Sequence, residues 1–183
     1  SQPAYRLGKN MSRIPAAIDV DAIEERLRKI SDAYDPFLFE SGGCIDLALA
    51  LFRSLKSDGL SALLCIALRD EHDEDGELWS TCLSHATVEV FDTSFDIGGR
   101  DADERWMKKW DPESEDFEIV DTDGMTSTFR WLAYEDEASF LAECNKWNVH
   151  IDEGRQALCE KLLSAMAPGS VDWKHQNPQR QVP

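Results

Sequence analysis

The N-terminal half of the chain contains two stretches in which apolar residues recur at helical spacing. In Asp19–Tyr34, the residues Ile23, Leu27 and Ile30 fall on one side, which predicts an amphipathic helix. Residues 42–58 form the second stretch, and their first half is apolar on almost every side. Because a helix without a polar face is buried on most sides, we expect this one to be the central helix of the domain.

Strand patterns follow directly after the second helix. The run Leu60–Asp70 is short and apolar, which predicts a buried strand, and Leu83–Phe91 alternates between apolar and polar residues. We expect a two-residue turn at Asp92 and Thr93, with a short return strand after it. Further strands are predicted at residues 117–120 and 129–134.

The remaining helical patterns lie in the C-terminal half, at residues 101–110, 136–148 and 152–167. An order of helices, then strands, then helices predicts an α+β fold, in which the central helix packs on an antiparallel sheet and additional helices follow at the C-terminal end. We expect a flexible N-terminal segment at residues 1–19, a single domain at 20–167 and a mobile C-terminal tail at 168–183.

The net charge of the chain limits the kinds of partner that it is expected to bind. The chain has 183 residues, of which 36 are acidic and 19 basic, and its net charge is −17. So negative a chain is not expected to bind nucleic acid or an anionic membrane through bulk charge, whereas it permits a basic protein partner. No apolar run approaches membrane-spanning length, and no apolar signal core is present at the start, so we expect a cytoplasmic protein or a delivered effector.

The cysteines do not predict disulfides or a metal site. The chain has 5 of them, with no CxxC pair and no Cys/His cluster at zinc spacing, so we expect reduced thiols and neither a metal nor an organic cofactor. Cys65 and Cys159 lie in apolar runs and are predicted core residues, whereas Cys82 is predicted to face solvent.

One cysteine stands in a context that favours chemistry. Cys44 follows Gly42 and Gly43 at the start of the central helix, where free N–H groups and the helix dipole stabilise a thiolate. Downstream, His85 lies on the polar face of its strand and Asp96 lies on the return strand. Nucleophile, base and orienting group are the roles that a thiol hydrolase needs, so we expect a Cys44–His85–Asp96 triad.

The expected hairpin leaves the third member of this triad open. A turn at Asp92 and Thr93 would pair Asp96 with Glu89, about four positions from His85 or roughly 13 Å along a strand. A bulge, strong twist or a longer loop is needed to close that gap. Asp92 is therefore the second candidate and Glu89 the third.

The segments "SGGCIDLALALFRSL" and "SHATVEVFDTSFDIGG" resemble the papain-like cysteine hydrolase and transferase superfamily, above all its compact NlpC/P60-type and transglutaminase-core branches. The resemblance covers about residues 34–99 and implies a cysteine at the start of a buried helix, a histidine on a strand and a polar residue on the next strand. Papain-like proteases also carry a glutamine before the cysteine, and none occurs between Gln2 and Cys44.

The tryptophan that usually follows the cysteine is missing as well. These departures favour amidase, deamidase, acyltransferase or transglutaminase chemistry over a papain-type endopeptidase. The oxyanion would rest on the Cys44 N–H and on a second donor from Gly43, Ser41 or Tyr34. Trp106 and Trp110 share one helix face and are candidates for the floor of a cleft.

The sequence therefore supports two alternative functions. The first is a cysteine-dependent hydrolase or acyl-transferase that acts on an amide, isopeptide or thioester bond of a protein or peptide substrate. The alternative is an acidic, non-catalytic binding protein of the immunity type, which captures a basic partner through the acidic runs at residues 70–77 and 111–118.

Overall fold

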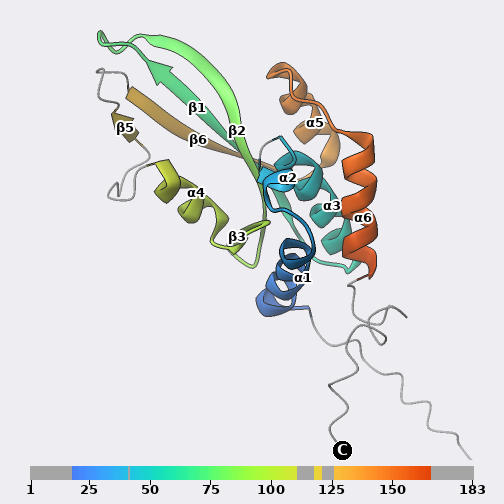
Figure 1. Ribbon diagram of the computed structural model, residues 1–183. Helices are drawn as coiled ribbons and strands as arrows, with labels where there is room; N and C mark the ends of the chain where they lie inside the picture. Colours follow the sequence, from blue (N-terminus) through green and yellow to red (C-terminus); the bar gives the residue numbers. More distant parts are fainter. Residues whose placement is uncertain (1–17, 41, 111–117, 121–125, 166–183) are drawn as a thin grey trace, which may run out of the picture.

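The computed structural model describes residues 18–40, 42–110, 118–120 and 126–165 (Figure 1). The helices are α1 (Val20–Ala33), α2 (Phe37–Glu40), α3 (Cys44–Ser57), α4 (Ala102–Trp110), α5 (Glu137–Lys146) and α6 (Glu153–Ala165). The strands are β1 (Leu63–His72), β2 (Leu78–Val90), β3 (Thr93–Asp96), β4 (Gly99–Arg100), β5 (Glu118–Val120) and β6 (Thr126–Tyr134). The predicted N-terminal segment, apart from residues 18 and 19, and the predicted C-terminal tail lie outside these residues.

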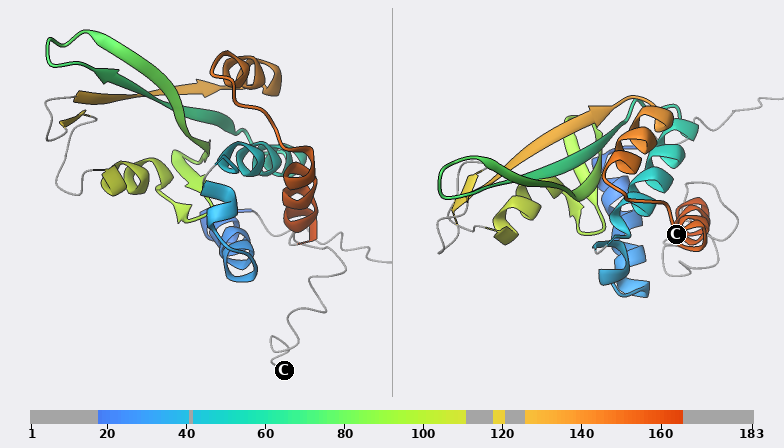
Figure 2. Two further views of the ribbon diagram at one scale, coloured as in Figure 1. Left: turned by 45° about the horizontal axis from the view of Figure 1, so that its top comes forward. Right: turned by 90° about the horizontal axis from the view of Figure 1, so that it is seen from above.

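The fold is α+β, with an antiparallel sheet whose strand order is β4-β3-β2-β1-β6-β5. The long central strands β1 and β2 form a hairpin that extends beyond helices α3, α5 and α6 (Figures 1 and 2). The α+β prediction and the placement of the long helices are therefore confirmed. Sequence patterning did not predict the short helix α2, whose Phe37 and Leu38 are exposed and give no amphipathic signal.

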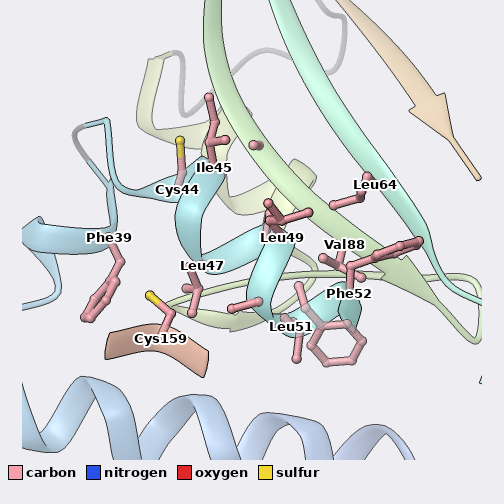
Figure 3. Packing of buried hydrophobic residues seen from close by; sticks show 14 of the residues in the cluster. Phe39, Cys44, Ile45, Leu47, Leu49, Leu51, Phe52, Leu64, Val88 and Cys159 are labelled. Carbon is pink, nitrogen blue, oxygen red and sulfur yellow. The ribbon is translucent and has the colours of Figure 1, made fainter. Parts of the chain in front are cut away.

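The central helix α3 packs against one face of the sheet, as its apolar sequence predicts. Leu64 and Ile66 of β1 pair with Val88 and Ala86 of β2, and all four side chains belong to the core that surrounds α3. Helices α1 and α6 complete this core from other sides, and Figure 3 shows Cys159 of α6 close to the α3 side chains.

Helix α4 covers the opposite face of the sheet. Trp106 and Met107 of α4 pack with Ala67 of β1 and Phe129 of β6 in a second, smaller cluster. Since His85 pairs with Ala67, the histidine belongs to this covered face and is buried. The polar face of β2 is therefore covered, because the amphipathic helix α4 lies over it.

The β2–β3 turn lies one residue earlier than predicted. Val90 pairs with Thr93, and the turn residues Phe91 and Asp92 both have φ of 55°. A tight hairpin turn needs two residues of positive φ, and a β-branched residue such as Thr93 resists that conformation. Thr93 therefore starts the return strand instead of closing the turn.

Strand β2 is also longer than predicted and carries a bulge. His85 pairs with Ala67, whereas the next pair along is Leu83 with Leu68, so Ser84 is an extra residue in β2. A bulge of this kind increases the local twist and re-aims the neighbouring side chain. His85 is the residue that directly follows this bulge.

Candidate active site

The glycine pair before Cys44 has a steric explanation. A Cβ on Gly43 would lie 1.8 Å from the backbone oxygen of Leu38, so only glycine allows α2 to pack this closely against the start of α3. Gly42 has φ of 82°, which glycine adopts readily. Gly43 is also the N-cap and provides no side-chain hydrogen bond to the first N–H groups of α3.

Cys44 is the first residue of α3. Figure 3 shows its sulfur pointing away from Leu47, Leu49 and Leu51, the core side chains farther along the helix. The Cys44 thiol is close enough to the imidazole to act on it, since Cys44 is one of the groups that raise the pKa of His85. The predicted nucleophile therefore lies near the predicted base.

The start of α3 approaches His85 at a part of β2 that is not paired with β3. The pairing of β3 with β2 extends over Val88–Val90, and His85 lies beyond its end. The N-terminal end of α3 lies beside β2 in Figure 3. A helix on one face of the sheet can therefore contact an imidazole that belongs to the other face.

Asp96 is the carboxylate that meets His85. Its Oδ2 lies 2.9 Å from His85 Nε2, so Nδ1 is the ring nitrogen left for a second partner. Because Phe95 pairs with Val88, Asp96 is level with Thr87, two positions from His85 and about 7 Å along the strand. The shifted turn removes half of the separation expected from the sequence, and a diagonal contact spans the remainder.

The second oxygen of Asp96 is fully occupied. Asp96 Oδ1 accepts a hydrogen bond of 2.6 Å from Arg105 Nη2 and one of 2.8 Å from the N–H of Gly98. The carboxylate is largely buried, with its side chain 10% exposed. It is therefore held in one orientation by α4 and by its own turn, independently of His85.

The charges of the site favour an ionised pair. Burial acts to lower the pKa of His85, but the hydrogen bonds with Asp96 and Cys44 outweigh it and raise that pKa to about 9. Burial likewise acts to raise the pKa of Asp96, and the bonds from His85 and Arg105 lower it to about 2. At neutral pH the imidazole therefore holds a proton and the carboxylate does not.

Trp106 forms the wall of the site on the α4 side. Its ring stacks on the His85 imidazole with centroids 5.7 Å apart and planes 5° from parallel, and Phe129 and Trp131 support it edge-on. Stacking fixes the imidazole plane and excludes water from it. Trp106 therefore contacts His85, whereas the side chain of Trp110 lies outside the described residues.

The two alternative carboxylates lie elsewhere. Asp92 is exposed in the β2–β3 turn. Glu89 pairs with Ser94 across β2 and β3 and lines a small hollow with Cys65 and Thr87. Among the described residues, no hydrogen bond or ion pair joins either carboxylate to His85.

The other thiols lie in environments unlike that of Cys44. Burial raises the pKa of Cys65, Cys144 and Cys159 to about 12, which keeps these thiols protonated, and the predicted core positions of Cys65 and Cys159 are confirmed. Cys82 is exposed, as predicted.

Access to the sulfur is narrow. Cys44 is 5% exposed and His85 3%, so neither side chain opens widely to solvent. Helix α2, with its exposed Phe37 and Leu38, borders the start of α3. Of the expected second oxyanion donors, Ser41 lies outside the described residues.

No group of three or more His, Cys, Asp or Glu side chains suited to a metal ion occurs in the described part of the chain. Within that same part, no helix has the length and apolar character needed to cross a membrane. Comparison with known proteins adds no relative: no protein-family model matches the chain, and neither a curated protein nor a solved structure is significantly similar to it.

Proposed function

We propose that the chain is a cysteine-dependent hydrolase or acyl-transferase that acts on an amide, isopeptide or thioester bond, with Cys44 as nucleophile. One observation carries the proposal: the His85 ring is hydrogen-bonded to the Asp96 carboxylate at 2.9 Å and lies near the Cys44 thiol, which helps to raise the pKa of the ring. Nucleophile, base and orienting group in mutual contact are the arrangement that activates a thiol.

In the acylation step, the Cys44 sulfur attacks the substrate carbonyl carbon. His85 accepts the thiol proton in this step, and its pKa of about 9 lets the ring hold a proton at neutral pH. As the tetrahedral intermediate collapses, the C–N or C–S bond breaks and His85 gives that proton to the leaving amine or thiol. The product of the step is a thioester on Cys44.

In the second step, His85 acts as a base again. It takes a proton from water or from an acceptor amine, which attacks the thioester carbonyl and releases Cys44. Asp96 keeps the ring in the tautomer that this exchange needs, because its Oδ2 accepts from Nε2 and leaves Nδ1 for the proton in transit.

The negative oxygen of the tetrahedral intermediate requires donors near Cys44. The free N–H groups at the start of α3 provide them, since Gly43 does not cap the helix. The papain-like superfamily has the same chain order: a cysteine at the start of a central helix, a histidine on a strand and a polar residue on the next strand. This order supports the proposal that the chain is papain-like.

The proposal is tested by trapping the acyl-enzyme. We would incubate the protein with an activated thioester and with a glutamine-containing peptide, quench with acid, and locate added mass on Cys44 by peptide mapping. We expect an adduct on Cys44 in the wild type, none in C44A and a slower one in H85Q. A wild-type adduct confined to Cys82, the exposed thiol, would overturn the proposal.

A second function is supported by the exposed tip of the β1–β2 hairpin. Glu74, Asp75, Glu77 and the apolar Leu78 and Trp79 are all exposed there, and Trp79 is 73% exposed. We propose as the alternative that this tip captures a basic protein. Most of the other predicted acidic surface, at residues 111–118, lies outside the described residues.

This alternative is tested with a lysine-rich peptide as the probe, using calorimetry at low and high salt. We expect E74K/D75K to weaken binding at least about tenfold, whereas E153K on the distant helix α6 leaves it unchanged. Equal losses in both variants would reduce the effect to bulk charge and contradict a specific docking tip.

A further inference from the structure

Arg105 of α4 is hydrogen-bonded to the turn that carries Asp96. Its Nη2 donates to Asp96 Oδ1 at 2.6 Å and to the Gly99 oxygen at 2.9 Å, while its Nε donates to the Arg100 oxygen at 2.8 Å. The guanidinium is thus fixed by three acceptors, two of which are backbone atoms. The guanidinium cannot move away from the carboxylate without breaking these hydrogen bonds.

The chain makes room for this guanidinium at Gly98. A Cβ on Gly98 would lie 2.1 Å from Arg105 Nη1 and 2.9 Å from its Cζ, so any larger residue would displace the side chain. The glycine that donates its N–H to Asp96 is therefore also the glycine that admits Arg105.

Helix α4 presents Arg105 and Trp106 to the two ends of one hydrogen bond. Trp106 stacks on His85, and Arg105 binds the partner of His85, Asp96. The start of α4 is anchored to β3 because Ser94 and Asp103 are hydrogen-bonded. The helix is therefore positioned to act on the charge of the Asp96–His85 pair and not only to cover it.

We propose that Arg105 is a positioning residue that shares the Asp96 carboxylate with His85 and thereby weakens the hold of Asp96 on the imidazolium. The proposal rests on the function proposed above, in which His85 must release its proton to the leaving group. A carboxylate that served His85 alone would bind the imidazolium proton more tightly and make the ring a weaker acid.

The groups that face His85 define the expected effect. Asp96 from β3 and the Cys44 sulfur from α3 favour the imidazolium, and Trp106 from α4 carries no charge. Arg105 is the cation bound to the far oxygen of Asp96, and it is partly screened because its side chain is 38% exposed. Removing its charge should raise the pKa of His85 by about half a unit.

The test is an NMR titration of His85 in R105Q, with no substrate present. The His85 signal is assigned by its loss in H85N. We expect the His85 pKa to rise by about half a unit in R105Q, and R105K, which keeps the charge, to restore it toward the wild-type value. G98A, which displaces the guanidinium without removing it, is expected to shift the pKa in the same direction as R105Q.

The matched control is R130Q, which breaks the ion pair between Arg130 of β6 and Asp70 of β1. This substitution should leave the His85 pKa unchanged. A His85 pKa that stays constant or falls in R105Q would overturn the proposal, since Arg105 would then only anchor Asp96. The titration requires no activity, so its result is separate from that of acyl-enzyme trapping. A wild type that forms no adduct on Cys44 would overturn the proposed function instead.

Discussion

His85 Nε2 lies 2.9 Å from Asp96 Oδ2, although the two residues are not directly opposite each other on β2 and β3. The diagonal contact exists because the hairpin turns at Phe91 and Asp92. A turn one residue later would move Asp96 two positions farther from His85 along β2. The register of a tight turn therefore determines which carboxylate the imidazole meets.

Replacing Asp96 with asparagine should lower the pKa of His85 by at least about one unit from its value of about 9, because the amide keeps a hydrogen bond but removes the negative charge. The measurement is the same NMR titration of the imidazole. D92N and E89Q serve as controls and should leave the value unchanged. A shift in D92N equal to that in D96N would show that general charge, rather than the contact, sets the His85 pKa.

The His85 pKa predicts how stability depends on pH. Because the folded-state value of about 9 lies above the ordinary 6.5, His85 contributes stability that is fully present below pH 6.5 and is lost as the pH rises toward 9. The free energy of unfolding should fall across this window by up to about 1.4 kcal/mol per pH unit. Urea denaturation at a series of pH values measures it, and H85Q should flatten the dependence.

The window has an upper limit that is set by other groups. The buried thiols Cys65, Cys144 and Cys159, with pKa values near 12, lose their own stabilising contribution as the pH rises from 9 to 12. Comparison of wild type with H85Q should therefore stop near pH 9. An identical slope for both proteins below that pH would contradict the ionised pair.

Gly43→Ala should destabilise the fold by about 2 kcal/mol or more, because the new Cβ would lie 1.8 Å from a backbone oxygen that cannot move without α2. Gly154→Ala is the matched control. Its Cβ would meet its nearest neighbour at an ordinary 3.4 Å in the first turn of α6, so it should be neutral or slightly stabilising. Equal thermal stability of the two variants would contradict the close approach of α2 to α3.

Arg155→Gln should destabilise the protein by about 3 kcal/mol at neutral pH, because it leaves the carboxylate of Asp46 buried without its cation. Asp46 is fully buried in the first turn of α3 and receives 2.6 Å and 3.0 Å bonds from Arg155 Nε and the N–H of Asp152. R28Q, which removes exposed ion pairs within α1, should cost less than about 1 kcal/mol. Equal losses in denaturant midpoint would argue against this tether between α3 and α6.

The long elements were predictable because each carries its own periodic signal. The spacing of Ile23, Leu27 and Ile30 defines α1, and the apolar start of α3 marks it as the central helix. Alternation along β2 gives the correct two faces. It does not reveal that α4 covers the polar face, because that depends on packing between segments distant in sequence.

The residues of the candidate site could be predicted from the sequence, but the way in which they come together could not. Glycines before Cys44, a histidine on a strand and a following aspartate are visible in the chain. The bulge at Ser84 and the turn at Phe91 are not visible, because each depends on small differences in backbone preference. Arg105 was missed for the same reason, since its role requires α4 to lie beside the β3–β4 turn.

The central claim is that His85 activates Cys44, and the rate of Cys44 alkylation by iodoacetamide tests it most directly. Near neutral pH, site-resolved mass spectrometry should show that H85Q lowers this rate at least about tenfold and leaves that of the exposed Cys82 unchanged. Equal rates at Cys44 in the wild type and in H85Q would contradict the account.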